Sequence, residues 1–170
     1  MLVGIDEAGR GPVLGPLVIG IVCIPEDREE LLIQAGVKDS KDLTARRREE
    51  LEAWFNDRKE EEGWFGTTVS LSPETIDIAL QNKGLNWLEV DGFRTALETL
   101  PWKHDVSIFA DACDVNAERF TQRILTDLDR WPWPQSRMVS EHKADTRHPV
   151  VAMASILAKE ERDRTIAAMK

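Results

Sequence analysis

Short apolar runs rich in β-branched residues predict five strands. Residues 2–5 form one such run, which ends abruptly in the charged pair Asp6 and Glu7, and residues 13–24 form a second run. Three further strands are predicted over 64–71, 105–110 and 136–140, the last at a sheet edge. The first run is expected to lead into a charged turn, and Asp111 directly follows the fourth run, so that two strands deliver carboxylates at their ends.

Helical spacing of apolar positions predicts helices between these strands. Thr44, Ser72 and Asn116 are typical N-cap residues and precede predicted helices over 44–60, 73–80 and 116–129. Two more helices are expected over 85–99 and 148–169, the last with its inward face formed by Val151, Ala154, Leu157 and Ala158. Hairpin pairing first and strand-helix alternation later favour an α/β fold, a mixed sheet with helices on both faces.

Composition indicates one compact domain over residues 1–170. Of the 170 residues, 42% are hydrophobic, enough for a core without disulfides. No run approaches the roughly 20 apolar residues of a membrane span, and the N-terminus lacks a secretion-signal pattern, so we expect a soluble, cytoplasmic protein without a membrane partner. Cys23 and Cys113 stand in apolar or small-residue surroundings, which favours small buried thiols over a disulfide or a zinc site.

The formal charge of −9 at first argues against a nucleic-acid partner, because phosphate binding draws on lysine and arginine. The acidic residues concentrate in 26–30, 49–62 and 89–98, which we interpret as solvated helix faces. Basic residues fall near the segments that carry the candidate chemistry, so a local basic surface is feasible. They include Arg10, Lys38, Lys41, Arg46, Arg47, Arg48, Lys143, Arg147, Lys159, Arg162 and Arg164.

Four carboxylates are candidates for a metal site. Asp6 and Glu7 follow a buried strand, where two neighbouring charges are costly unless a cation neutralises them. Asp111 and Asp145 could converge with them if their strands are neighbours, although Asp111 could equally cap a turn and Asp145 alone is a weaker signal. Oxygen donors without a Cys or His pair favour Mg²⁺ or Mn²⁺ over zinc.

The residues after Asp6 and Glu7 add a phosphate-binding signal. Gly9 and Gly11 allow close backbone approach to a phosphate, and Arg10 between them can contact it. Five segments in this order resemble ribonuclease HII, in the form typical of archaeal and eukaryotic members. They are GIDEAGRGPVLGPLV at 4–18, VKDSKDLT at 37–44, ADACDVN at 110–116, EHKAD at 141–145, and PVVAMASILAK at 149–159 followed by Arg162 and Asp163.

The resemblance implies a ribonuclease H-like fold with a five-stranded mixed sheet. It implies two-metal hydrolysis of the RNA strand of RNA/DNA hybrids, with embedded ribonucleotides in duplex DNA as a further candidate substrate, and products that carry 5'-phosphate and 3'-hydroxyl ends. Asp6, Glu7, Asp111 and Asp145 match the family's metal-binding catalytic acids. Gly9, Arg10 and Gly11 match the segment that reads the 2'-hydroxyl, while Asp39, Ser40, Lys41 and Lys143 match positions that would hold the phosphate backbone, or else form an exposed loop. No catalytic role is expected for His142.

The chain also departs from the family pattern. Family members usually continue past the last helix, and a tyrosine in that extension stacks at the ribonucleotide junction, whereas this chain ends at Lys170 and has no tyrosine. Junction selectivity and substrate affinity are therefore expected to differ. The family's clamp-binding peptide is absent as well, so we expect no sliding-clamp contact by that route. We also expect a monomer. Trp131 and Trp133 favour packing of a rigid loop over base stacking.

Two other interpretations stay open from the sequence. The domain could bind hybrids with weak or no turnover, because the C-terminal segment is missing. It could also be another ribonuclease H-like enzyme, such as a DNA resolvase or a phosphoryl-transfer ATPase. The Gly-Arg-Gly segment and the lack of a Gly-rich nucleotide loop count against both the resolvase and the ATPase.

Overall fold

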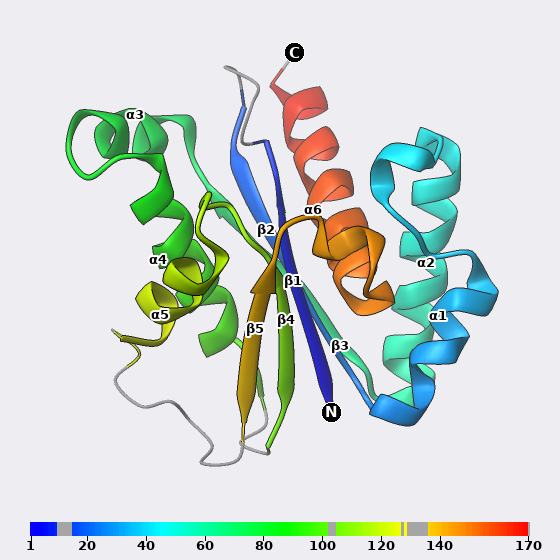
Figure 1. The fold of residues 1–170 in the computed structure, drawn as a ribbon. Coiled ribbons are helices and arrows are strands. Elements are labelled where there is room, and N and C mark those ends of the chain that lie inside the picture. Colours follow the sequence, from blue (N-terminus) through cyan, green and yellow to red (C-terminus); the bar gives the residue numbers. More distant parts are fainter. Residues whose placement is uncertain (10–14, 102–104, 127, 129–135, 170) are drawn as a thin grey trace.

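The computed structural model describes residues 1–9, 15–101, 105–126, 128 and 136–169. The predictions for Arg10, Gly11, Trp131 and Trp133 lie outside these residues. A five-stranded sheet in the order β3-β2-β1-β4-β5 forms the centre of the fold (Figure 1). Its strands are β1 (Leu2–Ala8), β2 (Leu17–Ile24), β3 (Phe65–Leu71), β4 (Ser107–Asp111) and β5 (Arg137–Glu141). The pairs β1-β2 and β2-β3 are antiparallel and the pairs β1-β4 and β4-β5 are parallel, which confirms the mixed sheet.

Strand β1 continues through Asp6 and Glu7, so the predicted turn at these residues is wrong. The parallel ladder with β4 ends at Ile5, opposite Ala110, but the antiparallel ladder with β2 runs on to Ala8, opposite Val18. The β2 partner therefore keeps the backbone extended past the apolar run. Because successive residues of a strand face opposite sides of the sheet, Asp6 and Glu7 are directed to different faces.

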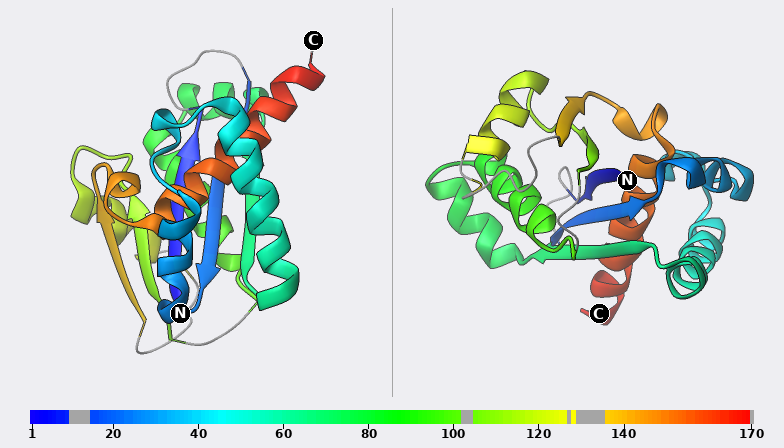
Figure 2. Two further views of the ribbon diagram at one scale, coloured as in Figure 1. Left: turned by 90° about the vertical axis from the view of Figure 1, so that its right-hand side faces the viewer. Right: turned by 90° about the horizontal axis from the view of Figure 1, so that it is seen from below.

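Helices cover both faces of the sheet, as predicted (Figure 2). On one side α1 (Glu29–Ala35), α2 (Ala45–Glu62) and α6 (Pro149–Ala168) enclose one apolar core. On the other side α4 (Leu85–Glu98) and α5 (Ala117–Thr126) enclose a second core, with α3 (Pro73–Gln81) beside α4. Short 3-10 turns lie at η1 (Glu26–Arg28), η2 (Ser40–Asp42) and η3 (Ala144–Thr146).

Most predicted helix starts are confirmed by their caps. The side chains of Thr44, Ser72 and Asn116 accept hydrogen bonds from the backbone N–H groups three residues later, at 3.1, 3.2 and 3.0 Å. Helix α1 was not predicted, because it begins with charged residues and only one of its apolar residues, Leu32, is buried, so the apolar pattern is weak. Among the described residues no helix has both the length and the apolar composition needed to cross a membrane.

Helix α6 lies directly on β1 and β2. A Cβ atom at Gly4 would come within 2.3 Å of the Val150 carbonyl oxygen, and one at Gly20 within 2.1 Å of the Ala154 carbonyl oxygen. Only glycine permits this approach at these two positions. The predicted inward face of α6 is confirmed, since Val151, Ala154, Leu157 and Ala158 are all buried. This close packing fixes the position of α6, and therefore of its polar residues, relative to the end of the sheet.

Two predictions about individual side chains have different outcomes. Cys23 and Cys113 are buried and free, as predicted. Residues 89–98 were interpreted as a solvated face, which is wrong for Glu89, because its side chain is fully buried. Glu89 lies on the same stripe of α4 as the buried Phe93 and Ala96, at a spacing of four and then three residues.

Candidate active site

Three aspartates from three separate elements converge at one end of the sheet. Asp6 lies on β1, Asp111 is the last residue of the neighbouring parallel strand β4, and Asp145 lies in η3. Each offers a carboxylate oxygen within 4.8 Å of those of the other two. Asp6 and Asp145 are 3% and 9% exposed. The parallel pairing of β1 and β4 explains the meeting of Asp6 and Asp111, because both strands run toward the same edge.

Burial and mutual repulsion make these carboxylates hard to ionise together. Burial, followed by the charges of Glu7, Asp111 and Asp145, raises the pKa of Asp6 well above its usual value. Burial, with the nearby charges of Asp39 and Asp111, raises the pKa of Asp145 to about 6. A divalent cation would replace this repulsion with attraction. The donor set, which is made of carboxylate oxygens, therefore fits a hard cation.

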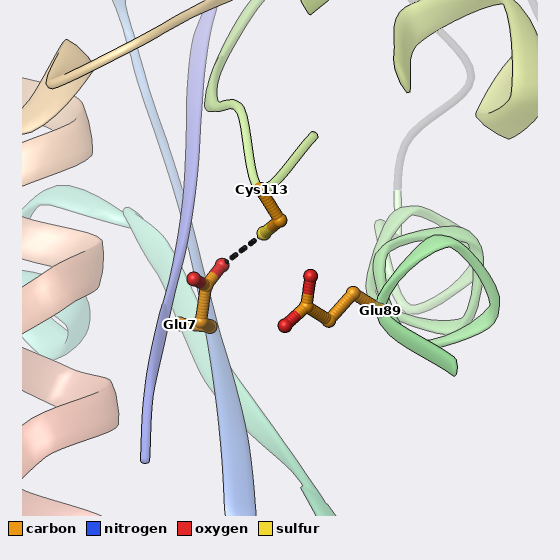
Figure 3. Close-up of side chains that lie close together, drawn as sticks. All are labelled: Glu7, Glu89 and Cys113. Carbon is orange, nitrogen blue, oxygen red and sulfur yellow. Dashed lines mark hydrogen bonds between the residues drawn. The ribbon is translucent and has the colours of Figure 1, made fainter. Parts of the chain in front are cut away.

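Glu7 reaches the site from the opposite face of the sheet. The Cys113 thiol donates a hydrogen bond to its Oε2 atom, with Sγ and Oε2 2.6 Å apart (Figure 3). Glu89 on α4 completes this second group, in which each residue has a ligand atom within 4.8 Å of the others. Glu7 also lines the pocket that contains the three aspartates. The structure thus divides the four predicted acids into a cluster of three aspartates and Glu7, whose side chain is contacted from the opposite face of the sheet.

The pocket around the aspartates includes several of the predicted substrate-binding residues. Gly9, Ser40 and Lys41 line it, whereas Lys143 is exposed in the turn between β5 and η3, outside the described lining. Arg48, Ser155 and Lys159 also line this pocket, although no role was predicted for Ser155 and the two basic residues were noted only for their charge. Three cationic side chains therefore border an acidic centre.

Arg48 connects the loop that carries Ser40 and Lys41 to helix α6. Its guanidinium donates to the carbonyl oxygens of Leu43 and Ser40, at 3.0 and 3.4 Å, and forms an ion pair with Glu160 at 3.1 Å. The Ser40 and Ser155 hydroxyls lie 2.9 Å apart and add a second link. The sequence held a signal for Arg48, because it precedes the buried Leu51 and Phe55 on α2 by three and seven residues.

Gly9 bounds the pocket in a conformation reserved for glycine. Its φ angle is +101°, and a Cβ atom there would lie 2.3 Å from Nε of Arg162 and 2.6 Å from the Pro16 carbonyl oxygen. The buried Arg162 donates from Nε to that same carbonyl oxygen at 3.0 Å. Arg162 on the last helix therefore packs against both Gly9 and Pro16 beside the pocket.

Comparison with known proteins agrees with this geometry. The family model for ribonuclease HII matches residues 3–170. The chain belongs to the ribonuclease HII family. The ribonuclease HII of Methanosarcina barkeri is 42% identical over 100% of the chain and 74% of that protein, and the ribonuclease HII of Pyrococcus abyssi is 44% identical over 98% and 70%. The crystal structure of ribonuclease H2 from Pyrococcus horikoshii superposes with a TM-score of 0.83 at 37% identity, over 99% of this chain and 75% of that one.

Membership of the ribonuclease HII family makes the chain an endoribonuclease that hydrolyses the RNA strand of RNA/DNA hybrids. The ribonuclease H-like fold that the sequence predicted is confirmed. The alternative of a hybrid-binding domain without turnover is not supported by these relatives.

Proposed function

We propose that Asp6, Asp111 and Asp145, together with Glu7, hold two divalent cations, Mg²⁺ or Mn²⁺, at the scissile phosphate of the hybrid. The convergence of the three aspartate carboxylates within 4.8 Å carries this proposal. When bound, such a pair of cations supplies an activated water and neutralises charge on the attacking and leaving oxygens. The raised pKa values of Asp6 and Asp145 support the assignment, since the protein alone does not balance these charges.

The basic residues of the pocket would bind and orient the substrate. Lys41 and Lys159 border the aspartates, and Lys159 is restrained by an ion pair with Asp163 at 3.1 Å. We assign them to the phosphates that flank the scissile bond, where a positive charge offsets the repulsion from the acidic centre. Arg48 would act indirectly, by fixing the loop that carries Ser40 and Lys41. The exposed Lys143 would contact the backbone farther along the duplex.

The Gly9-Arg10-Gly11 segment would read the ribonucleotide. A backbone that lacks side chains at both ends can approach the 2'-hydroxyl closely, and this hydroxyl is what separates RNA from DNA. The position of Gly9 in the lining of the pocket that contains the aspartates supports this assignment. The substrates would then include single embedded ribonucleotides as well as RNA strands, and the products would carry 5'-phosphate and 3'-hydroxyl ends.

The assembly of the protein stays a prediction. We expect a single-domain monomer that acts in the cytoplasm. One solved structure similar to this chain is the PCNA:RNase HII complex from Archaeoglobus fulgidus. The match has 37% identity and a TM-score of 0.79, and it covers 100% of this chain and 75% of that chain. Size-exclusion chromatography with and without a clamp protein tests this expectation.

The direct test of the proposed function uses two labelled duplexes, one with an RNA strand and one with a single ribonucleotide in DNA. Each is incubated with Mg²⁺, Mn²⁺ or a chelator, and the product ends are mapped. We expect metal-dependent cleavage of both duplexes and none in chelator. Cleavage that persists in chelator would overturn the metal assignment, and cleavage of only the RNA strand would overturn the role of the Gly9 segment at single ribonucleotides.

A further inference from the structure

The side of the sheet opposite the aspartates holds a buried polar group of three residues, of which the proposed reaction uses only Glu7. It consists of Glu7 on β1, Glu89 on α4 and Cys113 in the segment between β4 and α5 (Figure 3). Glu89 is fully buried and Cys113 is 6% exposed. Polar groups in an apolar core are costly unless they interact, and the second apolar core surrounds this group. The arrangement therefore needs an explanation beyond packing.

Cys113 is held rigidly where it contacts Glu7. Two residues before it, Asp111 belongs to the aspartate cluster, and the next residue, Asp114, is buried and ion-paired with Arg119 at 2.6 Å. His142 Nε2 also lies 2.8 Å from the Asp114 carbonyl oxygen. The segment that carries the thiol is thus fixed at both ends, and one of these ends is the aspartate cluster itself.

The thiol acts toward Glu7 as a hydrogen-bond donor. The 2.6 Å contact joins Sγ of Cys113 to Oε2 of Glu7, and the thiol is the donor in it. A protonated thiol can donate to a carboxylate but is a poor metal ligand. Glu89 stands beside this contact, with a carboxylate oxygen within 4.8 Å of the ligand atoms of Glu7 and Cys113.

We infer that Cys113 is a positioning residue, whose thiol holds the Glu7 carboxylate from behind and sets how Glu7 meets the divalent cations at Asp6, Asp111 and Asp145. The inference rests on the proposed function, because it requires Glu7 to serve the metal site. Outer partners of this kind orient a ligand, and their loss typically lowers metal affinity or activity by about 10- to 100-fold. Cys113 would link the two faces of the sheet, since it contacts Glu7 on one face and lies two residues after Asp111, which belongs to the aspartate cluster.

The test compares Cys113→Ala, which removes the donor, with Cys113→Ser, which keeps a donor of similar size. Cys23→Ala is the matched control, because Cys23 is a fully buried free cysteine in the same apolar core. Mn²⁺ binding without substrate is measured by calorimetry, and the Mn²⁺ concentration for half-maximal hybrid cleavage is measured in parallel. We expect Cys113→Ala to weaken both by roughly tenfold, Cys113→Ser to recover most of the loss, and Cys23→Ala to change neither.

Two results would overturn the inference while the proposed function stands. One is a Cys113→Ala protein that binds Mn²⁺ and cleaves with the metal dependence of the wild type. The other is an equal shift in Cys23→Ala, which would trace the effect to general loss of packing. If the wild type itself neither binds Mn²⁺ nor cleaves the hybrid, the proposed function fails first and the inference falls with it.

Discussion

Asp6 and Glu7 are adjacent in β1, yet their side chains belong to different groups on opposite sides of the sheet. Asp6 meets Asp111 and Asp145, whereas Glu7 meets Glu89 and Cys113. The alternation of side chains along a strand causes this separation. The candidate metal site therefore surrounds the end of β1 instead of lying on one face. Residues from both apolar cores can influence it.

Gly9→Ala is expected to reduce hybrid cleavage by more than about tenfold. The new methyl group would collide with the Arg162 guanidinium and the Pro16 carbonyl oxygen, and the backbone there has a φ angle of +101°. Displacement of Gly9 would disturb the segment that we propose reads the 2'-hydroxyl. Steady-state cleavage and thermal unfolding of the variant test the expectation.

Gly63→Ala is the control for Gly9→Ala, because it tests the effect of backbone strain without a steric clash. Gly63 also has a positive φ angle, +72°, but a Cβ atom there meets nothing within 4 Å. We expect a loss of about 1 kcal/mol in unfolding free energy and unchanged cleavage. If Gly9→Ala behaved in the same way, the pocket would not depend on close approach at Gly9.

Arg48→Ala is expected to destabilise the protein and weaken hybrid binding. Its side chain is 12% exposed and that of Glu160 is 7% exposed, so the variant leaves a buried carboxylate without its arginine partner, at a cost of about 3 kcal/mol. The loop with Ser40 and Lys41 also loses its anchor, so the KM for hybrid should rise several-fold. Arg46→Ala is the control, because the Arg46 side chain is 90% exposed and its pair with Glu50 contributes less than about 1 kcal/mol. Equal effects of the two variants would contradict the anchoring role.

The metal-free protein is expected to lose stability as the pH rises through about 6. In the folded state the pKa of Asp145 is raised from 3.8 to about 6, so this group favours folding below its unfolded pKa, and the contribution is lost as the pH passes the folded value. Added divalent cation should therefore raise the Tm more at about pH 7.5 than at about pH 5, where protons compete for the same oxygens.

Thermal unfolding at both pH values, with and without Mg²⁺, measures this linkage. Asp145→Asn removes one of the two aspartates with a raised pKa and should reduce the pH dependence of the metal-free protein. A Tm that rises with pH in the metal-free wild type between these values, or a metal effect independent of pH, would contradict the assignment.

Much of the fold follows from local signals in the sequence. Five apolar runs and the caps at Thr44, Ser72 and Asn116 predict the strands and three of the helix starts, because a cap and a periodic stripe act over a few residues. The meeting of Asp6 and Asp111 also follows once their strands are taken as parallel neighbours.

The remaining features depend on contacts that local patterns do not encode. The apolar run ends at Ile5, but pairing with β2 extends the strand and turns Glu7 away from Asp6. Glu89 resembles a solvent-exposed residue by its charge, and only its place on the buried stripe with Phe93 indicates otherwise. A partner 115 residues away, such as Ser155 for Ser40, needs the folded topology.

The most direct test of the metal site is the initial rate of hybrid cleavage as a function of Mn²⁺ concentration for the wild type, Asp111→Asn and Asp57→Asn. Asp57 is exposed on α2, so its variant repeats the chemical change away from the pocket. We expect Asp111→Asn to retain the fold and to lose more than about 100-fold in rate at every Mn²⁺ concentration, while Asp57→Asn matches the wild type. A folded Asp111→Asn protein that cleaves at a rate near that of the wild type would contradict it.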